Sequence, residues 1–349
     1  MTQKKASLVG TAVLLTLLFA GLLAGLMTTA QHTQAAPNNI CTVNDDGAAD
    51  YSTISAAILD DTCSEIQVAA GTYSENLNVQ RLLIIEGAGS DLTIVDSPNN
   101  AANSLQVAYG GLMTITGMTF QNGFNGVHVL STELYLVDVR AQHNSNRGVF
   151  VGTNATVYVQ NGRIFQNAGG GLLNLNESST LQVENSQIIS NTTVAAQGGG
   201  IYNAGILTVD HSQILSNTAG SSGGGIYHAP TNTTQVMTLT NSILAYNQTF
   251  GNSGGGLFTA GQTVVQNTAF VNNYAGAFGG GVYAGNFGDT SMNFDFTNVT
   301  ISGNRTQMAA AGLLVTKLDI GATMASFSFS TITNNWMIGS TGRRRVDCR

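Results

Sequence analysis

The sequence predicts an all-β fold in which parallel strands wind in one direction as a solenoid. Two markers repeat in register between residues 122 and 335 of its 349 residues, and apolar residues alternate between them. The alternation, as in Leu181 and Val183, is the two-residue period of a strand. A glycine followed by an apolar residue, such as Gly200-Ile201, opens each repeat. An asparagine closes each repeat, at intervals of 22 to 31 residues: Asn122, Asn144, Asn167, Asn191, Asn217, Asn247, Asn273, Asn304 and Asn335.

One coil per repeat follows from these markers. Each coil should rise by about 4.8 Å, the spacing between paired strands, and bury its apolar face only against its neighbours. The glycine triplets at 169–171, 198–200, 223–225, 254–256 and 279–281 allow a positive φ and close backbone approach. The polar stretches after the asparagines, as at 192–197, 218–222 and 249–253, should project as loops.

The recurring asparagine predicts a structural ladder. Its amide can bond the backbone and the amide one coil above, and asparagine tolerates the left-handed backbone of a turn. The ladder is expected at Asn167, Asn191, Asn217, Asn247, Asn273, Asn304 and Asn335.

Residues 1–36 predict export. Leu8 to Met27 is an apolar run behind Lys4 and Lys5, and small and polar residues follow it up to Pro37. This order is typical of a cleaved secretion signal. The run is also long enough to remain as a membrane anchor, through residues 8–27, if it is not cleaved. Either way we expect an extracellular or cell-surface protein.

Residues 37–100 are expected to hold an N-terminal cap and the first coils. An amphipathic helix from Thr53 to Leu59 would cover the first strand edge, and strands are expected at 66–68, 77–79, 83–85 and 93–95. In an oxidising compartment, Cys41 and Cys63 should form a disulfide that closes a loop of about 20 residues, which contributes roughly 3 kcal/mol to stability. Cys348 is left over in the tail.

Two stretches carry a family resemblance. Asp50 to Ile58 and Ile66 to Glu75 resemble the opening of right-handed parallel β-helix proteins of the pectin-lyase-like superfamily. The Gly-Gly-Gly-Ile-Tyr units and the Ile-x-x-Asn or Phe-x-x-Asn units of residues 101–338 are similar to repeats of polymorphic outer-membrane-protein passenger domains. The resemblance implies a right-handed β-helix. It implies no single activity, because the superfamily mixes lyases, hydrolases, esterases and non-catalytic adhesins.

Composition restricts the partners. Only 9% of residues are charged, and 19 acidic residues outnumber 12 basic ones, which argues against a nucleic-acid partner. No Cys-x-x-Cys pair occurs and the histidines are scattered, so no metal and no cofactor are expected. A polysaccharide or a cell-surface glycan is the partner that the resemblance favours.

Catalytic motifs of the resembled enzymes are absent. Gly-His-Gly, Arg-Ile-Lys and Gln-Asp-Thr do not occur, and Arg163-Ile164-Phe165 lacks the lysine. One constellation remains as a weak catalytic candidate: Glu184 and Asp210 on consecutive coils, with His211 beside them. Carboxylates about 5 Å apart approach the spacing of retaining glycosidases, and their repulsion would raise one pKa. The favoured alternative is a pair of solvated charges at strand ends.

An aromatic column forms the second candidate. Tyr202, Tyr227, Phe258 and Tyr283 each follow the inward apolar residue of a glycine-rich unit, so they should lie on one face of consecutive coils. They would act as a stacked structural ladder, which is the favoured interpretation, or as a ligand-binding strip for sugar rings.

These features favour a secreted or surface-displayed, non-catalytic β-helix that serves adhesion, surface structure or polysaccharide binding. A polysaccharide lyase or a glycoside hydrolase is the alternative. The irregular tail, residues 339–349, places Arg343, Arg344, Arg345 and Cys348 where the repeat calls for glycine and isoleucine. We therefore expect a truncated end, with no cover over the last coil and self-association through that C-terminal edge.

Overall fold

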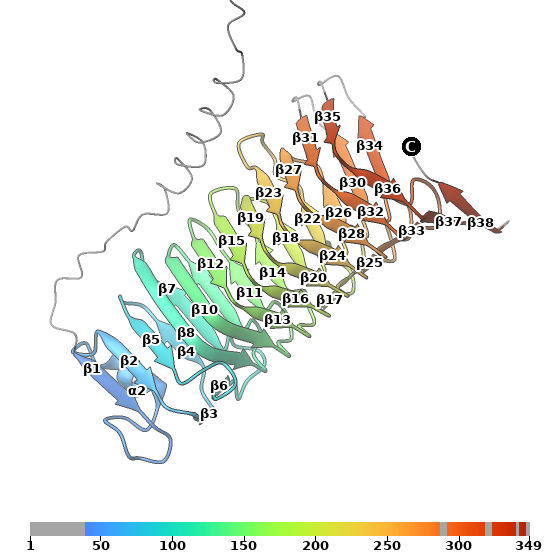
Figure 1. Cartoon of the computed structure of the whole chain (residues 1–349). Coiled ribbons are helices and arrows are strands. Elements are labelled where there is room, and N and C mark those ends of the chain that lie inside the picture. Colours follow the sequence, from blue (N-terminus) through green and yellow to red (C-terminus); the bar gives the residue numbers. More distant parts are fainter. Residues whose placement is uncertain (1–38, 287–291, 318–322, 340–341, 347–349) are drawn as a thin grey trace, which may run out of the picture. The chain divides into compact units, whose positions relative to one another are not determined.

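The computed structural model describes residues 39–286, 292–317, 323–339 and 342–346. It confirms the parallel β-helix: short strands from successive coils pair side by side in three sheets, here called A, B and C (Figure 1). The predicted export segment, residues 8–27, lies outside the described residues. Within them the one helix is six residues long, and none is long and apolar enough to cross a bilayer.

Sheet A holds 21 strands: β1 (Ile40–Val43), β2 (Glu65–Val68), β3 (Gly71–Tyr73), β5 (Ile84–Gly87), β6 (Thr93–Asp96), β8 (Leu112–Gln121), β10 (Glu133–Gln142), β12 (Thr156–Gln160), β13 (Arg163–Phe165), β15 (Thr180–Glu184), β16 (Gln187–Ile189), β19 (Ile206–Asp210), β20 (Gln213–Leu215), β23 (Met237–Thr240), β24 (Ile243–Ala245), β27 (Thr263–Gln266), β28 (Ala269–Val271), β31 (Met292–Thr297), β32 (Thr300–Ser302), β35 (Thr323–Ser328) and β36 (Thr331–Thr333).

Sheet B holds ten strands: β4 (Leu77–Val79), β7 (Leu105–Ala108), β9 (Val127–Leu130), β11 (Val149–Val151), β14 (Leu172–Asn174), β18 (Ile201–Asn203), β22 (Ile226–His228), β26 (Leu257–Thr259), β30 (Val282–Asn286) and β34 (Leu313–Lys317). Sheet C holds seven strands: β17 (Thr192–Thr193), β21 (Thr218–Ala219), β25 (Gln248–Thr249), β29 (Tyr274–Ala275), β33 (Arg305–Thr306), β37 (Asn335–Gly339) and β38 (Gly342–Val346).

A typical coil takes one strand from sheet B, two from sheet A and one from sheet C, as in β18, β19, β20 and β21. The next coil pairs with it in parallel register, for example Ile201 with Ile226 and Thr218 with Gln248. A side chain therefore occupies the same place on every coil, and each sequence position becomes a column along the stack.

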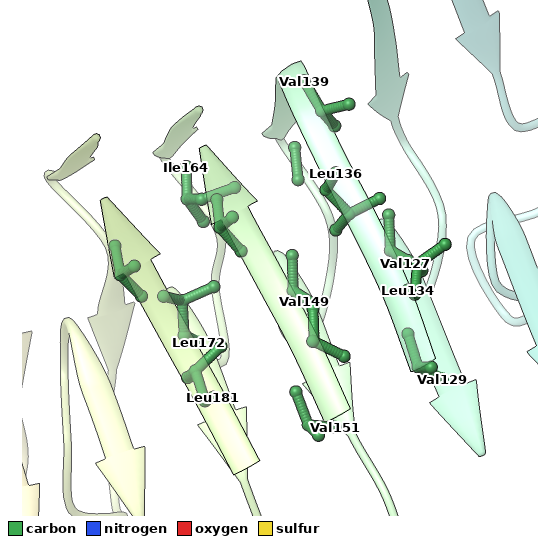
Figure 2. Packing of buried hydrophobic residues seen from close by; sticks show 14 of the residues in the cluster. Val127, Val129, Leu134, Leu136, Val139, Val149, Val151, Ile164, Leu172 and Leu181 are labelled. Carbon is green, nitrogen blue, oxygen red and sulfur yellow. The ribbon is translucent and has the colours of Figure 1, made fainter. Parts of the chain in front are cut away.

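Inward columns form the core. Figure 2 shows valine, leucine and isoleucine side chains of neighbouring strands between residues 127 and 181 gathered in the interior, including Val127, Val149 and Leu172. These three are fully buried and occupy one column, because their strands pair in register. Burying each such side chain contributes about 1.5–3 kcal/mol, which compensates for strands too short to be stable alone.

The ladder asparagines are buried at the corner between sheets A and C. Asn191 shows the pattern: its backbone N–H and its Nδ2 both donate to Oδ1 of Asn217, each at 3.0 Å, and Nδ2 also donates to the Ile164 carbonyl at 2.9 Å. The same bonds repeat from one coil to the next through Asn144, Asn167, Asn191, Asn217, Asn247, Asn273, Asn304 and Asn335.

The ladder extends one coil beyond the predicted members, to Asn144. In the coil before, the ladder position is Gly123, whose N–H donates to Oδ1 of Asn144, so the recurring Asn122 lies outside the ladder. The expected left-handed backbone is wrong for the ladder asparagines. The residue before each one takes that backbone, as at Ser190 and Ser216, with φ of 54° and 55°.

A second ladder runs between the two strands that each coil contributes to sheet A, and the sequence had not suggested it. The N–H of Ser186 donates to Oγ of Ser212, and the N–H of Ser212 donates to Oγ of Ser242, both at 3.1 Å. Each hydroxyl also donates to the carbonyl two residues back, as Ser212 does to Asp210 at 2.7 Å. Hydroxyls can replace amides here because one donor and one acceptor per coil suffice.

Each of the three glycines in a triplet is required for a different steric reason. A Cβ at Gly198, where φ is 68°, would lie 2.7 Å from the Cα of Tyr202. At Gly199 it would meet the Thr218 carbonyl oxygen at 2.5 Å, and at Gly200 the Gly225 carbonyl oxygen at 2.5 Å. A side chain would therefore clash at each of these positions, where the loop returns to the stack. The backbone of Tyr202, the first residue of the aromatic column, packs closely against Gly198.

The predicted loops are misplaced in part. The first residues after the ladder asparagines form the two-residue strands of sheet C, as β17 and β21 do, because their backbone groups pair with the next coil. One of the long insertions instead lies between sheets B and A, at residues 229–236 between β22 and β23. Repeat length alone could not show at which corner the extra residues leave the coil.

The helix α2 (Ile54–Leu59) lies where the cap was expected and packs on β1, β2 and β4. The Glu75 carboxylate accepts from the N–H groups of Ile54 and Ser55, both at 2.8 Å. At the other end the Arg81 guanidinium donates to four carbonyls, those of Ala57, Ile58, Asp60 and Cys63. Charges of the right sign at both ends stabilise a helix that is otherwise too short. A disulfide joins Cys41 to Cys63 beside it.

The expectation of an uncovered last coil is wrong for sheet C. Strand β38, formed by residues of the arginine-rich tail, folds back on β37 in antiparallel register and occupies that edge. In sheets A and B, the strands β35, β36 and β34 have no further partner among the described residues. Phe327, which lies in the inward column of Phe296, is accordingly 41% exposed. Self-association through this end stays a prediction.

Candidate functional site

The carboxylate pair lies where the sequence placed it, but its two members are tied to different neighbours. Glu184 and Asp210 are in register on β15 and β19. Gln160 donates to Glu184 at 3.2 Å, from the coil before. Asp210 accepts from Thr240 at 2.5 Å and from Asn241 at 2.8 Å, from the coil after.

Asp210 is held as an anion. Burial by itself would raise the pKa of Asp210, but hydrogen bonds from Thr240, Asn241 and His211 outweigh burial and lower it. His211 bonds the other carboxylate oxygen at 2.7 Å. A general acid needs a raised pKa, and the structure does not raise that of Asp210. The three residues are brought together, yet Glu184 and Asp210 bond to side chains of other coils, and His211 bonds to Asp210 within its own coil.

The aromatic column is present on the outer face of sheet B. Ring centroids are 5.3 Å apart for Tyr202 and Tyr227, 4.9 Å for Tyr227 and Phe258, and 5.1 Å for Phe258 and Tyr283, with interplanar angles of 23°, 13° and 1°. Both faces of Tyr227 and Phe258 are therefore covered by neighbouring rings. A sugar binds an aromatic side chain through the ring face, so these two rings cannot serve as stacking platforms. The geometry agrees with the favoured interpretation, a structural ladder, rather than with the alternative of a sugar-binding strip.

A polar network continues this face toward the N-terminus. Asn125 donates from Nδ2 to Asn103 at 2.9 Å, and Asn146 donates to Asn125 at 2.9 Å. Asn103 also contacts Nδ1 of His128 at 3.1 Å, and His128 packs edge-on against Phe150. Burial lowers the pKa of His128, so the imidazole is neutral at neutral pH.

Arg147 lies between this network and the aromatic column, and the sequence interpretation missed it. The residue is 6% exposed, and burial lowers the pKa of its guanidinium to about 10, so it remains a cation at neutral pH. It stands two residues before Val149, at the position that later coils fill with Gly170 and Gly199. The sequence did carry a sign of this site, because Arg147 stands where the next repeats have glycine.

A hollow on the outer face of sheet C is the other feature that the sequence did not suggest. It measures 280 Å³ and is lined by Asn272, Gly303, Arg305, Asn334, Trp336 and Ile338; we call it the Trp336 hollow. Trp336 on β37 pairs in register with Arg305 on β33. Gly303 stands in a column with Asn272 and Asn334, and the Asn272 side chain occupies the space where a Cβ of residue 303 would lie.

A wider depression of 520 Å³ borders the first coils. Alanines and backbone line much of it, among them Ala48, Ala49, Ala69 and Ala88. Neither a cation nor an aromatic ring lines it, so we give it no role.

The interior holds a buried histidine. His228 is fully buried, and its Nδ1 lies 2.8 Å from Nδ2 of Asn203. Oδ1 of Asn203 accepts a hydrogen bond from Nδ2 of Asn174 at 2.7 Å. Burial lowers the pKa of His228 to about 4. In the part of the chain that the structure describes, no group of three His, Cys, Asp or Glu side chains is placed to hold a metal ion.

Comparisons with known proteins agree with the fold. A family model described as a right handed beta helix region matches residues 81–236. No curated protein matches the sequence. Among solved structures, ORF18 of Geobacillus virus E2 has a TM-score of 0.52 at 13% identity, over 97% of this chain and 65% of its own length.

Two solved enzymes are similar at a lower level. A pectin methylesterase in complex with a hexasaccharide has a TM-score of 0.44 at 14% identity, over 67% of this chain and 79% of that one. An alginate lyase from Paenibacillus sp. str. FPU-7 has a TM-score of 0.41 at 12% identity, over 83% and 98%. At these identities neither enzyme indicates what this chain does. The chain is a parallel β-helix by its own strand pairing, and the family model agrees.

Proposed function

We propose that the protein is an exported, non-catalytic β-helix that binds polysaccharide outside the cell. The observation that carries this proposal is the Trp336 hollow. There an indole ring, a guanidinium and the Asn272 amide surround a space just below the lower end of the usual range for ligand sites, about 300–1,000 Å³. A space of this size suits a single sugar ring.

Each group has a part in such binding. The Trp336 ring is half-buried, and it offers an apolar surface for the C–H groups of a pyranose. Arg305 is exposed and makes no ion pair with a described residue, so its N–H groups can donate to sugar hydroxyls. Asn272 supplies a donor and an acceptor in the same hollow.

The absence of catalysis is supported by the carboxylate pair. Asp210 is held ionised by three neighbours, and the aromatic column is closed by its own stacking. Both act as links between coils. Export is supported by the apolar run at residues 8–27.

The test uses the purified full chain on a panel of immobilised polysaccharides. We expect retention on at least one of them, and we expect Trp336→Ala to weaken it about tenfold, as loss of a stacking ring does. The matched control is Tyr246→Asn, which removes an exposed ring outside the hollow at a left-handed position that asparagine tolerates. Equal retention by native protein and Trp336→Ala would contradict the assignment of the hollow.

Assays for new reducing ends and for unsaturated products, on the same panel of polysaccharides, test the proposal that the protein is non-catalytic. We expect no product. Product that disappears in Asp210→Asn and Glu184→Gln would instead support the glycosidase alternative.

A further inference from the structure

Arg147 is a buried cation that has no counter-ion among the residues that the structure describes. Among the described residues the ion pairs are Arg81 with Asp61, Arg140 with Asp91, and His211 with Asp210, and none includes Arg147. Its side chain donates one hydrogen bond, from Nη1 to the Gly198 carbonyl at 3.2 Å. A buried charge ordinarily requires a partner of opposite sign, because its desolvation is costly.

Glycine makes room for this side chain. Val149, Leu172 and Ile201 are in register on three consecutive coils, so Gly198 belongs to the second coil after that of Arg147. The guanidinium reaches it by lying across Gly170, where any Cβ would overlap Nη1. There the guanidinium lies close enough to Tyr202 for the two side chains to interact electrostatically.

Two nitrogens of the guanidinium remain available. Nε and Nη2 make no hydrogen bond to a described residue, and neither is among the buried side-chain atoms that lack a partner. They therefore reach solvent, although only 6% of the residue is exposed. A guanidinium presents its N–H groups in a fixed fork that matches the two oxygens of an oxyanion.

We propose that Arg147, beside Tyr202, binds a single oxyanion group, such as the carboxylate of an acidic sugar or a free inorganic oxyanion. The anion accepts from Nε and Nη2 and neutralises the buried charge. This site is separate from the Trp336 hollow and does not depend on it. Charge-assisted bonds in a partly dry site are stronger than those of an exposed arginine.

Calorimetric titration of the full chain tests the proposal at constant ionic strength. Sodium glucuronate and glucose form a matched pair that differs in the carboxylate, and sodium sulfate is the free-ion arm. We expect glucuronate to bind and glucose not to bind. Sulfate that binds as well as glucuronate would assign the site to free oxyanions, and sulfate that does not would assign it to a carboxylate borne on a sugar.

Variants locate the binding. Arg147→Met should weaken glucuronate or sulfate binding at least about tenfold. Arg163→Met is the matched control, because its exposed guanidinium lies over Phe165, 4.4 Å from the ring centroid, and its loss should leave binding unchanged. If Arg147→Met fails to fold, Arg147→Lys replaces it. Lysine keeps the charge but loses the fork, so weaker binding is again expected.

Three results would overturn the proposal: no binding of either anion by the native chain, undiminished binding by the Arg147 variants, or an equal loss in Arg163→Met. Trp336→Ala should bind the anion like the native protein. Failure of the polysaccharide proposal and failure of this one are therefore distinguishable.

Discussion

At the scale of single residues, buried amides and hydroxyls hold the coils in register. Each ladder asparagine uses both its donor and its acceptor, so an apolar replacement of similar size would leave groups on two other coils without partners. An unsatisfied buried polar group costs about 1–3 kcal/mol. The ladder therefore determines which residue can stand at that corner.

Asn217→Ala should lower the free energy of unfolding by about 3–5 kcal/mol. It leaves the backbone N–H of Asn191 and one of the two side-chain N–H groups of Asn191 without an acceptor, and it removes a donor from the Ile188 carbonyl. Denaturant titration measures the change. Asn252→Ala is the control, at an exposed asparagine outside the ladder, and should shift stability by less than about 0.5 kcal/mol. Similar losses in both variants would contradict the special role of the ladder.

At the scale of elements, no strand is long enough to be stable by itself. Sheet C strands such as β21 and β25 have two residues each, and they persist because ladders lie on one side of them and glycine triplets on the other. Stacked rings stabilise sheet B in the same way, with centroids about one coil apart. Short elements thus take their stability from repetition.

Tyr227→Ala should lower the free energy of unfolding by about 2–4 kcal/mol, because it removes two ring contacts from the middle of the column. Tyr227→Phe keeps both contacts and should be close to neutral. Thermal and denaturant unfolding of the pair measures the difference. A neutral Tyr227→Ala would show that the rings do not stabilise the stack.

At the scale of the whole molecule, nearest-neighbour coils share one interior, so a single protonation inside it affects the entire stack. His228 is the clearest case, with a pKa lowered from 6.5 to about 4 by burial. An unfolded chain would bind the proton below its pKa of 6.5, whereas the folded chain resists it until about 4. Stability is therefore full above pH 6.5 and falls as the pH is lowered toward 4.

His228→Asn should reduce this pH dependence by up to about 3 kcal/mol between pH 6.5 and pH 4. Asparagine is a suitable substitute because Asn174 and Asn203 fill the same column in the two coils before. Stability is measured by denaturant titration at a series of pH values. His143→Asn, at an exposed left-handed position, should keep the native pH profile, and a matching change there would exclude His228 as the source.

The sequence by itself determined the architecture. Parallel pairing turns a repeat into columns, so the spacing of asparagines, glycine pairs and alternating apolar residues was enough to predict the coils, the ladder and the aromatic column. It also predicted the helix α2 and placed Glu184 beside Asp210, because neighbouring repeats bring the same position to the same face.

Only the tertiary structure decided what those columns can do. The direction of the pKa shift of Asp210 depended on Thr240 and Asn241, which lie one coil away and some 30 residues later in the chain. Whether the ring faces of the aromatic column were accessible to a ligand depended on how the rings are oriented. The alternation of apolar and polar residues along a strand does not specify that orientation. Arg147 and the Trp336 hollow depend on side chains reaching across coils that lack a Cβ at Gly170 and Gly303. Such sites arise where a side chain of one coil occupies the space above a glycine of another coil. Which side chain occupies that space depends on the packing of the coils, and the sequence alone does not show it.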